Sequence, residues 1–243
     1  MAQTAHEFVL VHGAAHGAWC WDDVSRRLEA KGHRVVTLDL PGHGRRAAEA
    51  AQASVAAYAR AVADVMAREG VSRGVVVGHS LAGIVIPKVA ELAPGRVSHL
   101  VFLAAVVLPD GGSVMETHIP PATRPVWRGL ATGGGGQSML FPASVAWSRW
   151  MGDLDPGRPE AARAFASLTP QPLRPVLERV DMRVFYSMRV PRSYIRCLRD
   201  AAVPVARATE YAARLGVTPI DLDADHDVML SAPDALVRIL DRI

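Results

Sequence analysis

The order of apolar segments in this 243-residue chain predicts an α/β fold with a doubly wound, mostly parallel sheet and a helical insertion. Short apolar runs alternate with longer stretches in which apolar residues recur at helical spacing. Strands that alternate with helices form βαβ units, whose sheets are parallel and buried on both faces. Half of the residues are hydrophobic, so the chain can form a large core.

The first apolar run, at residues 8–11, predicts a strand that ends at a histidine and a glycine. The helix predicted over 18–30 has apolar residues on one face, and Gly32 follows it as a stop signal. Pro87 lies within the helix predicted over 81–93 and is expected to kink it. The other predicted strands cover 34–38, 75–77, 97–103, 193–198 and 218–222, and the other predicted helices cover 52–69, about 204–214 and a closing segment from Pro233.

The alternation stops between residues 106 and 190, where prolines are frequent and three of the five tryptophans occur. We therefore predict an α/β core formed by 1–105 and 191–243, with 106–190 inserted as a helical cap. The run of four glycines at 133–136 predicts a mobile segment within this cap.

Composition excludes several classes of function. The net charge is only +3 and the basic residues are scattered, which argues against nucleic-acid binding. No apolar window of about 18 residues predicts a membrane helix, and no basic leader predicts a signal peptide. The two cysteines, Cys20 and Cys197, lack metal-site spacing, so we expect buried thiols in a cytoplasmic protein.

A candidate nucleophile, Ser80, lies in the segment VVVGHSLAG at residues 75–83, where a predicted strand meets a predicted helix. A serine on such a sharp turn exposes its hydroxyl above the sheet and needs small residues two positions away on either side. Gly78 meets this requirement, whereas Ala82 replaces the second glycine. A helix N-cap would explain the serine alone. The Leu81 amide is a candidate oxyanion donor.

The candidate base is His226, which follows the last predicted strand and precedes the closing helix. The alternative is a surface-loop histidine. His12 and His79 come before Ser80 in the chain, whereas the base is expected to come last of the three catalytic residues. We therefore interpret both histidines as structural neighbours of the site. His12 and His16 lie in a glycine- and alanine-rich loop without a third ligand, so no metal site is expected.

Asp200 is the candidate acid, because it follows the strand at 193–198 and precedes His226 by 26 residues. Asp110 is the main rival, since it also follows a strand, whereas Asp39 precedes the serine. The loop after the first strand offers the Ala14 amide as the second oxyanion donor. A plain glycine turn is the alternative for this loop.

Three stretches carry a family resemblance: FVLVHGAAHGAWCWDDVSRRLEAKGHRVVTLDLPGHG, VVVGHSLAGIVI, and YIRCLRDAAVPVA with DADHDVML. They resemble the α/β-hydrolase superfamily, and more narrowly the plant methylesterase and hydroxynitrile lyase group with its bacterial esterase relatives. The resemblance implies the α/β-hydrolase fold and no cofactor. It also implies Ser80, Asp200 and His226 as a catalytic triad, with the Ala14 and Leu81 amides as oxyanion hole.

Two departures disfavour hydroxynitrile lyase activity. Lyases of this group carry a threonine where this chain has Gly13, and a lysine directly after the catalytic histidine. This chain has Asp227 there, and departing cyanide requires a cation rather than an anion. Three roles remain open for Asp227: it reaches the substrate, raises the pKa of His226, or points to solvent.

The predicted function is a serine hydrolase that cleaves a small hydrophobic carboxylic ester, an aromatic or methyl ester among the candidates. A biosynthetic enzyme of this fold (cyclisation, lactone or elimination chemistry) and a small-molecule receptor are the alternatives. The expected partner is the small-molecule ester, and a homodimer is left open. The residues expected to line the substrate pocket are Trp127, Met139, Phe141, Trp147, Trp150, Met151 and Asp227. The alternative is that these residues form the cap's own core.

Overall fold

A six-stranded sheet with every neighbouring pair parallel forms the centre of the computed structural model, which describes residues 5–133 and 136–243. Its strand order is β2-β1-β3-β4-β7-β8, which confirms the predicted α/β fold. Gly134 and Gly135 lie outside the described residues, and the mobile segment predicted at 133–136 falls on them. The strands are β1 (Glu7–Val11), β2 (Arg34–Thr37), β3 (Gly74–His79), β4 (Val97–Leu103), β7 (Arg192–Cys197) and β8 (Ile220–Leu222).

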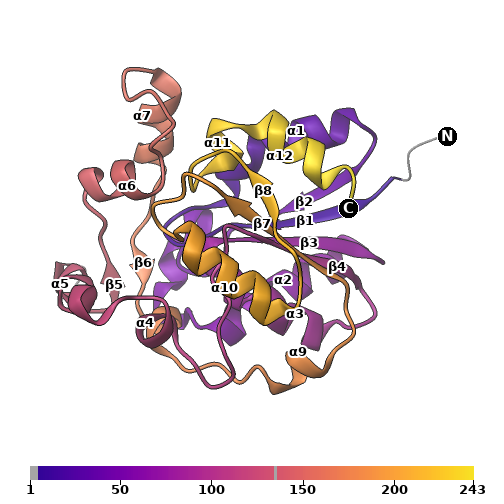
Figure 1. Cartoon of the computed structure of the whole chain (residues 1–243), viewed down its shortest axis with the longest axis horizontal. Coiled ribbons are helices and arrows are strands. Elements are labelled where there is room, and N and C mark those ends of the chain that lie inside the picture. Colours follow the sequence, from indigo (N-terminus) through magenta and orange to yellow (C-terminus); the bar gives the residue numbers. More distant parts are fainter. Residues whose placement is uncertain (1–4, 134–135) are drawn as a thin grey trace.

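Helices cover both faces of the sheet (Figure 1). Along β1, Val9 and Val11 pack into one core, whereas Phe8 and Leu10 pack into the other. Side chains of a strand alternate between faces, so a strand covered on both sides reads as one apolar run. The first core is closed by α2 (Val55–Arg68), α3 (Ile86–Leu92) and α10 (Val205–Leu215), and the second by α1 (Asp22–Ala30), α11 (Val228–Ser231) and α12 (Pro233–Leu240).

The segment predicted as one helix over 81–93 forms two elements in the structure, and the prediction that Pro87 kinks a helix is wrong. A 3₁₀ turn, η3 (Ser80–Ile84), follows β3 directly, and α3 begins afterwards with Pro87 in its first turn. A first-turn residue has no intrahelical acceptor for its N–H, so proline is tolerated there. Pro87 therefore helps to begin a new helix.

Short elements fill the chain between β4 and β7. Figure 1 shows α5, α6 and α7 beyond the carboxyl ends of the strands. Strands β5 and β6 pair antiparallel, apart from the main sheet. No helix within the described residues is long and apolar enough to cross a membrane. The elements are α4 (Val114–Thr117), η4 (Pro121–Thr123), α5 (Arg124–Gly133), β5 (Ser138–Met139), α6 (Ala143–Arg149), α7 (Pro159–Ala166), β6 (Gln171–Pro172), α8 (Arg174–Leu177) and α9 (Arg183–Ser187).

Candidate active site

Ser80 occupies a tight turn between β3 and η3, at the carboxyl edge of the sheet. Its φ is +53°, in the left-handed region that L residues rarely adopt. The neighbouring elements hold this conformation, and the turn presents the hydroxyl above the strands. The Ser80 hydroxyl lies 2.8 Å from Nε2 of His226, to which it can donate its proton.

Two glycines allow the backbone around Ser80 to pack closely. A Cβ added to Gly78 would lie 2.8 Å from Cγ2 of Ile86, and one added to Gly83 would lie 2.3 Å from the Val106 carbonyl oxygen. Ala82, by contrast, fits with its methyl group fully buried. The second position that needs a glycine is therefore 83 rather than 82, which explains why the departure from G-x-S-x-G is accommodated.

The His226 ring is hydrogen-bonded on both sides. Its Nδ1–H donates to Oδ2 of Asp200 over 2.7 Å, opposite the Ser80 contact. The other carboxylate oxygen, Oδ1, accepts the amides of Ala202 and Val203, each at 2.7 Å. Because both oxygens are engaged, the Asp200 carboxylate is fixed and holds the imidazole in one tautomer and orientation.

Asp110 and Asp39, the two alternatives to Asp200 as the acid, have hydrogen-bond partners elsewhere. Asp110 is exposed and accepts the Met182 amide at 2.9 Å. Asp39 accepts the Ala18 amide at 2.8 Å and so joins two loops. Within the described part of the chain, Asp200 is the carboxylate hydrogen-bonded to the His226 ring.

Opposing effects act on the charge of His226. Complete burial disfavours the imidazolium and lowers its pKa, but the Asp200 carboxylate raises it, as do Asp227 and Asp225. The carboxylates outweigh the burial, so the pKa of His226 lies above the ordinary value of 6.5. The ring is therefore a stronger base than a free histidine.

The peptide between Gly13 and Ala14 has a fixed direction. Nε2 of His12 accepts the Leu40 amide at 3.0 Å, so its proton is on Nδ1, which donates to the Gly13 carbonyl over 2.8 Å. In a planar trans peptide the N–H points opposite to the carbonyl, which directs the Ala14 amide away from His12. Ala14 lines the same cavity as Ser80.

The Leu81 amide begins the 3₁₀ turn after Ser80, and Leu81 lines that cavity as well. Within the described residues, no loop, turn or side-chain acceptor engages the amide of Ala14 or Leu81. The next amide along the first loop, that of Ala15, donates to the fully buried Gln171 side chain at 3.1 Å. Sequence reasoning missed Gln171, because no pattern indicates a partner 156 residues away.

Asp227 neither points to solvent nor lines the cavity beside Ser80. Its side chain is fully buried, and Oδ2 lies 3.0 Å from Nε2 of His16. Nδ1 of His16 lies 2.8 Å from the Ala14 carbonyl oxygen, so His16 connects Asp227 to the loop that follows β1. The Asp227 amide donates to the Trp150 carbonyl at 2.9 Å. Of the three roles left open, the structure supports an effect on the pKa of His226.

A metal could be held only at the expense of these hydrogen bonds. His79, His226 and Asp227 offer ligand atoms within 4.8 Å of one another. However, His226 already uses both ring nitrogens, and Nε2–H of His79 donates to the His226 carbonyl at 3.0 Å. A metal ligated by His226 would break its contact with either Ser80 or Asp200.

Aromatic and aliphatic side chains surround the cavity that contains Ser80. It is narrow, with about 50 Å³ of free volume, and the expected residues that line it are Trp127, Met139, Phe141 and Trp150. Trp147 and Met151 pack elsewhere: Trp147 stacks on Phe165, and Met151 is buried in a small core with Ala146 and Ala164. Trp147 therefore matches the alternative interpretation, a core within the inserted segment, whereas the core around Met151 also includes Ala15 and Ala202 from outside that segment.

Two polar side chains in this cavity, His118 and Arg149, were missed from the sequence. His118 follows α4 and Arg149 ends α6. No motif marks them, because their proximity to Ser80 depends on how the inserted segment folds over the sheet.

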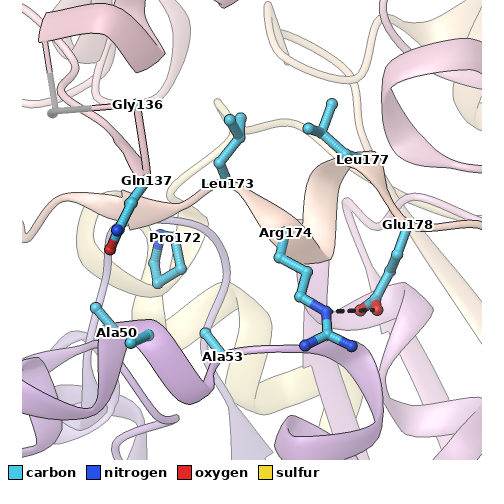
Figure 2. Close-up of a pocket in the computed structure, with 10 residues that line it drawn as sticks. Ala50, Ala53, Gly136, Gln137, Pro172, Leu173, Arg174, Leu177 and Glu178 are labelled. Atoms are coloured by element: carbon cyan, nitrogen blue, oxygen red, sulfur yellow. Dashed lines mark ion pairs between the residues drawn. The ribbon is translucent and has the colours of Figure 1, made fainter.

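A larger cavity lies away from Ser80 (Figure 2). It has about 490 Å³ of free volume and is lined by Ala50, Ala53 and residues of β6 and α8. Figure 2 shows its two charged side chains facing one another, with Arg174 3.6 Å from Glu178. None of the described residues that line this space is a serine, cysteine or histidine, so its size does not make it the reaction site.

Comparison with known proteins matches residues 8–239 to a family described as the alpha/beta hydrolase family. Putative methylesterase 11, chloroplastic, from Arabidopsis thaliana is 31% identical; the match covers 98% of this chain but only 63% of that protein. Methylesterase 7 from the same plant is 29% identical, with 96% and 94% covered. The crystal structure of a pyrethroid hydrolase from Sphingobium faniae JZ-2 has a TM-score of 0.80 and 26% identity, covering 98% of this chain and 97% of the other.

Gly13 provides a steric test of this site. A Cβ at this position would lie 2.8 Å from Cβ of Ser80 and 3.0 Å from Nδ1 of His79. We expect Gly13→Ala to displace Ser80 and to lower the free energy of unfolding by about 1–3 kcal/mol, measured by urea denaturation. Gly95→Ala is the control, because nothing lies within 4 Å of its added methyl group. Equal stability of the two variants would contradict this packing.

Asp227 provides an electrostatic test. Removing its charge in Asp227→Asn removes one of the effects that raise the pKa of His226, so this pKa should fall. It can be followed by NMR titration of the ring protons. Asp223→Asn removes an equal charge from an exposed position in the same loop and should leave the pKa near its wild-type value. An unchanged or higher pKa in Asp227→Asn would refute the assignment.

Proposed function

The chain belongs to the alpha/beta hydrolase family, and we propose that it is a serine hydrolase that cleaves a small carboxylic ester through an acyl-enzyme. One observation carries the proposal. The Ser80 hydroxyl, the His226 ring and the Asp200 carboxylate form a continuous hydrogen-bonded series with contacts of 2.8 and 2.7 Å. A serine is a weak nucleophile unless a base removes its proton, and this series provides that base.

In the proposed acylation step, His226 takes the Ser80 proton as the oxygen attacks the ester carbonyl. Asp200 stabilises the imidazolium that forms. The Ala14 and Leu81 amides stabilise the negative oxygen of the tetrahedral intermediate, and each such donor typically contributes about 3 kcal/mol. His226 then gives the proton to the departing alcohol, leaving an acyl group on Ser80.

Deacylation repeats these steps with water as the nucleophile. His226 removes a proton from the water, which attacks the acyl carbonyl, and returns it to the Ser80 oxygen as the acid leaves. The mechanism requires no cofactor or metal, since every proton transfer is made by groups of this chain.

The cavity supports a small ester as substrate. Its wall is mostly apolar, and its narrow free volume accepts a short acyl group, whereas an aromatic ring would require the side chains to rearrange. Within this proposal, residues 106–190 form the cap, because α5 and α6 carry several of the lining residues. The methylesterase and pyrethroid hydrolase relatives support ester cleavage.

Lyase activity is not supported. A threonine in place of Gly13 would bring its Cβ within 2.8 Å of Ser80, and Asp227 is an anion paired with His16 where a lyase carries a lysine. Product analysis with esters and lactones separates hydrolysis from cyclisation or elimination, and from binding without turnover.

The proposed compartment is the cytoplasm. Cys20 and Cys197 are both buried as free thiols, and burial raises the pKa of each well above its ordinary value. Such thiols are inert and fit a reducing environment. A homodimer stays a prediction.

Ser80→Ala tests the nucleophile. We expect hydrolysis of p-nitrophenyl acetate to fall about 10⁴-fold or more, because the acyl-enzyme cannot form. Ser167→Ala is the matched control, since Ser167 is exposed at the end of α7. Circular dichroism should show both variants folded. Full activity in Ser80→Ala would end the proposal.

The pH dependence of kcat/KM tests the base. Only neutral His226 accepts the Ser80 proton, so activity should rise with pH as the imidazolium loses its proton. Because the pKa of His226 is raised, the midpoint should lie above about 6.5. A rate that stays flat between about pH 5 and 8 would contradict the role of His226.

A further inference from the structure

We propose that the cavity beside Ser80 binds an anionic group through Arg149, so that the preferred ester carries a carboxylate on its acyl part. This inference rests on the proposed esterase function and specifies its substrate class. Half-esters of small dicarboxylic acids are the simplest compounds with this chemistry.

Arg149 is a charged side chain with few partners. It lies half-buried at the end of α6 and lines the cavity that contains Ser80. Its hydrogen bond to the Ala202 carbonyl is long, at 3.4 Å. No carboxylate in the described part of the chain lies within 4.0 Å of its guanidinium, whereas Arg196 pairs with Asp221 at 2.7 Å. Most of the five N–H donors of Arg149 are therefore available to a ligand.

Among the described residues that line the cavity, none is an aspartate or a glutamate that could neutralise Arg149. Asp200 is not part of the wall, and both of its oxygens are already engaged by His226 and two amides. A cation beside apolar surface is poorly solvated and poorly screened by salt. An anionic ligand that enters this space gains a charge-assisted hydrogen bond, whereas a neutral ligand leaves the guanidinium unpaired.

His118 adds a neutral polar group to the same wall. Burial, with the nearby positive charges of His226 and Arg149, lowers its pKa to about 4, so the ring is uncharged at neutral pH. Its Nδ1 lies 2.9 Å from the Tyr211 hydroxyl. When that hydroxyl donates to Nδ1, the proton is on Nε2, which becomes a second donor. The charge that selects an anion therefore comes from Arg149, and His118 supplies a hydrogen bond.

The test compares two esters that differ in charge and have the same leaving group. Monomethyl glutarate carries a free carboxylate, whereas dimethyl glutarate is neutral. Methanol release gives kcat/KM for each, at pH 8 and low salt. We expect the wild-type protein to prefer the half-ester by about tenfold or more, since a hydrogen bond between charged groups typically has an effect of this size.

Arg149→Gln should lower the ratio of the two kcat/KM values by about tenfold or more, and Arg149→Lys should lower it less. The matched control is Arg189→Gln, which removes an exposed arginine and gives the same net charge. Its ratio should equal that of the wild type.

Inhibition of the wild-type protein provides a measurement that does not depend on the folding of a variant. Glutarate should inhibit hydrolysis of p-nitrophenyl acetate more strongly than neutral glutaramide, and added salt should weaken only the inhibition by glutarate. Equal inhibition by the two compounds, or an unchanged substrate ratio in folded Arg149→Gln, would overturn the anion site and leave the esterase proposal intact. A folded wild-type protein that cleaves no ester would overturn both.

Discussion

The geometry of the candidate active site depends on one interaction: the imidazole of His226 is hydrogen-bonded on both sides. The ring of His226 lies between Ser80 and Asp200, which are 120 residues apart in the chain. Such contacts tolerate errors of only a few tenths of an ångström. A parallel sheet makes them attainable, because the chain segments that follow β3, β7 and β8 all emerge at the same edge. The apolar cores on both faces hold these strands in register, so the fold provides the alignment that the chemistry requires.

Three other buried histidines connect the loops around this imidazole. His12 sets the direction of the peptide that ends at Ala14, and His79 holds the backbone of His226. His16 joins the first loop to Asp227. Burial lowers the pKa of both His12 and His79 well below its ordinary value, so these two rings act as neutral hydrogen-bonding groups. These side chains thus connect the loops at the strand ends, together with backbone hydrogen bonds such as the one from the Val106 amide to the Ser80 carbonyl at 3.0 Å.

The sequence was sufficient to predict the fold and to select Ser80, Asp200 and His226, which the structure brings together, because apolar periodicity and strand-to-helix junctions are local signals. It could not supply contacts between distant loops. Gln171 and Arg149 belong to a segment without periodic pattern, and only its folded path brings them near Ser80. The partner of Asp227 was missed for the same reason. Pro87 was misinterpreted because a proline inside a helix and one at the start of a new helix look alike along the chain.

The hydrogen bond from the Asp227 amide to the Trp150 carbonyl connects the wall of the cavity to the residue next to the base. Under the proposed mechanism, an acyl group that pushed this wall outward would also strain the attachment of the His226 ring. A poorly fitting acyl group would then destabilise the transition state, in which alignment matters most, more than it destabilises the initial complex. Acyl groups that fit poorly should accordingly slow turnover more than they weaken binding.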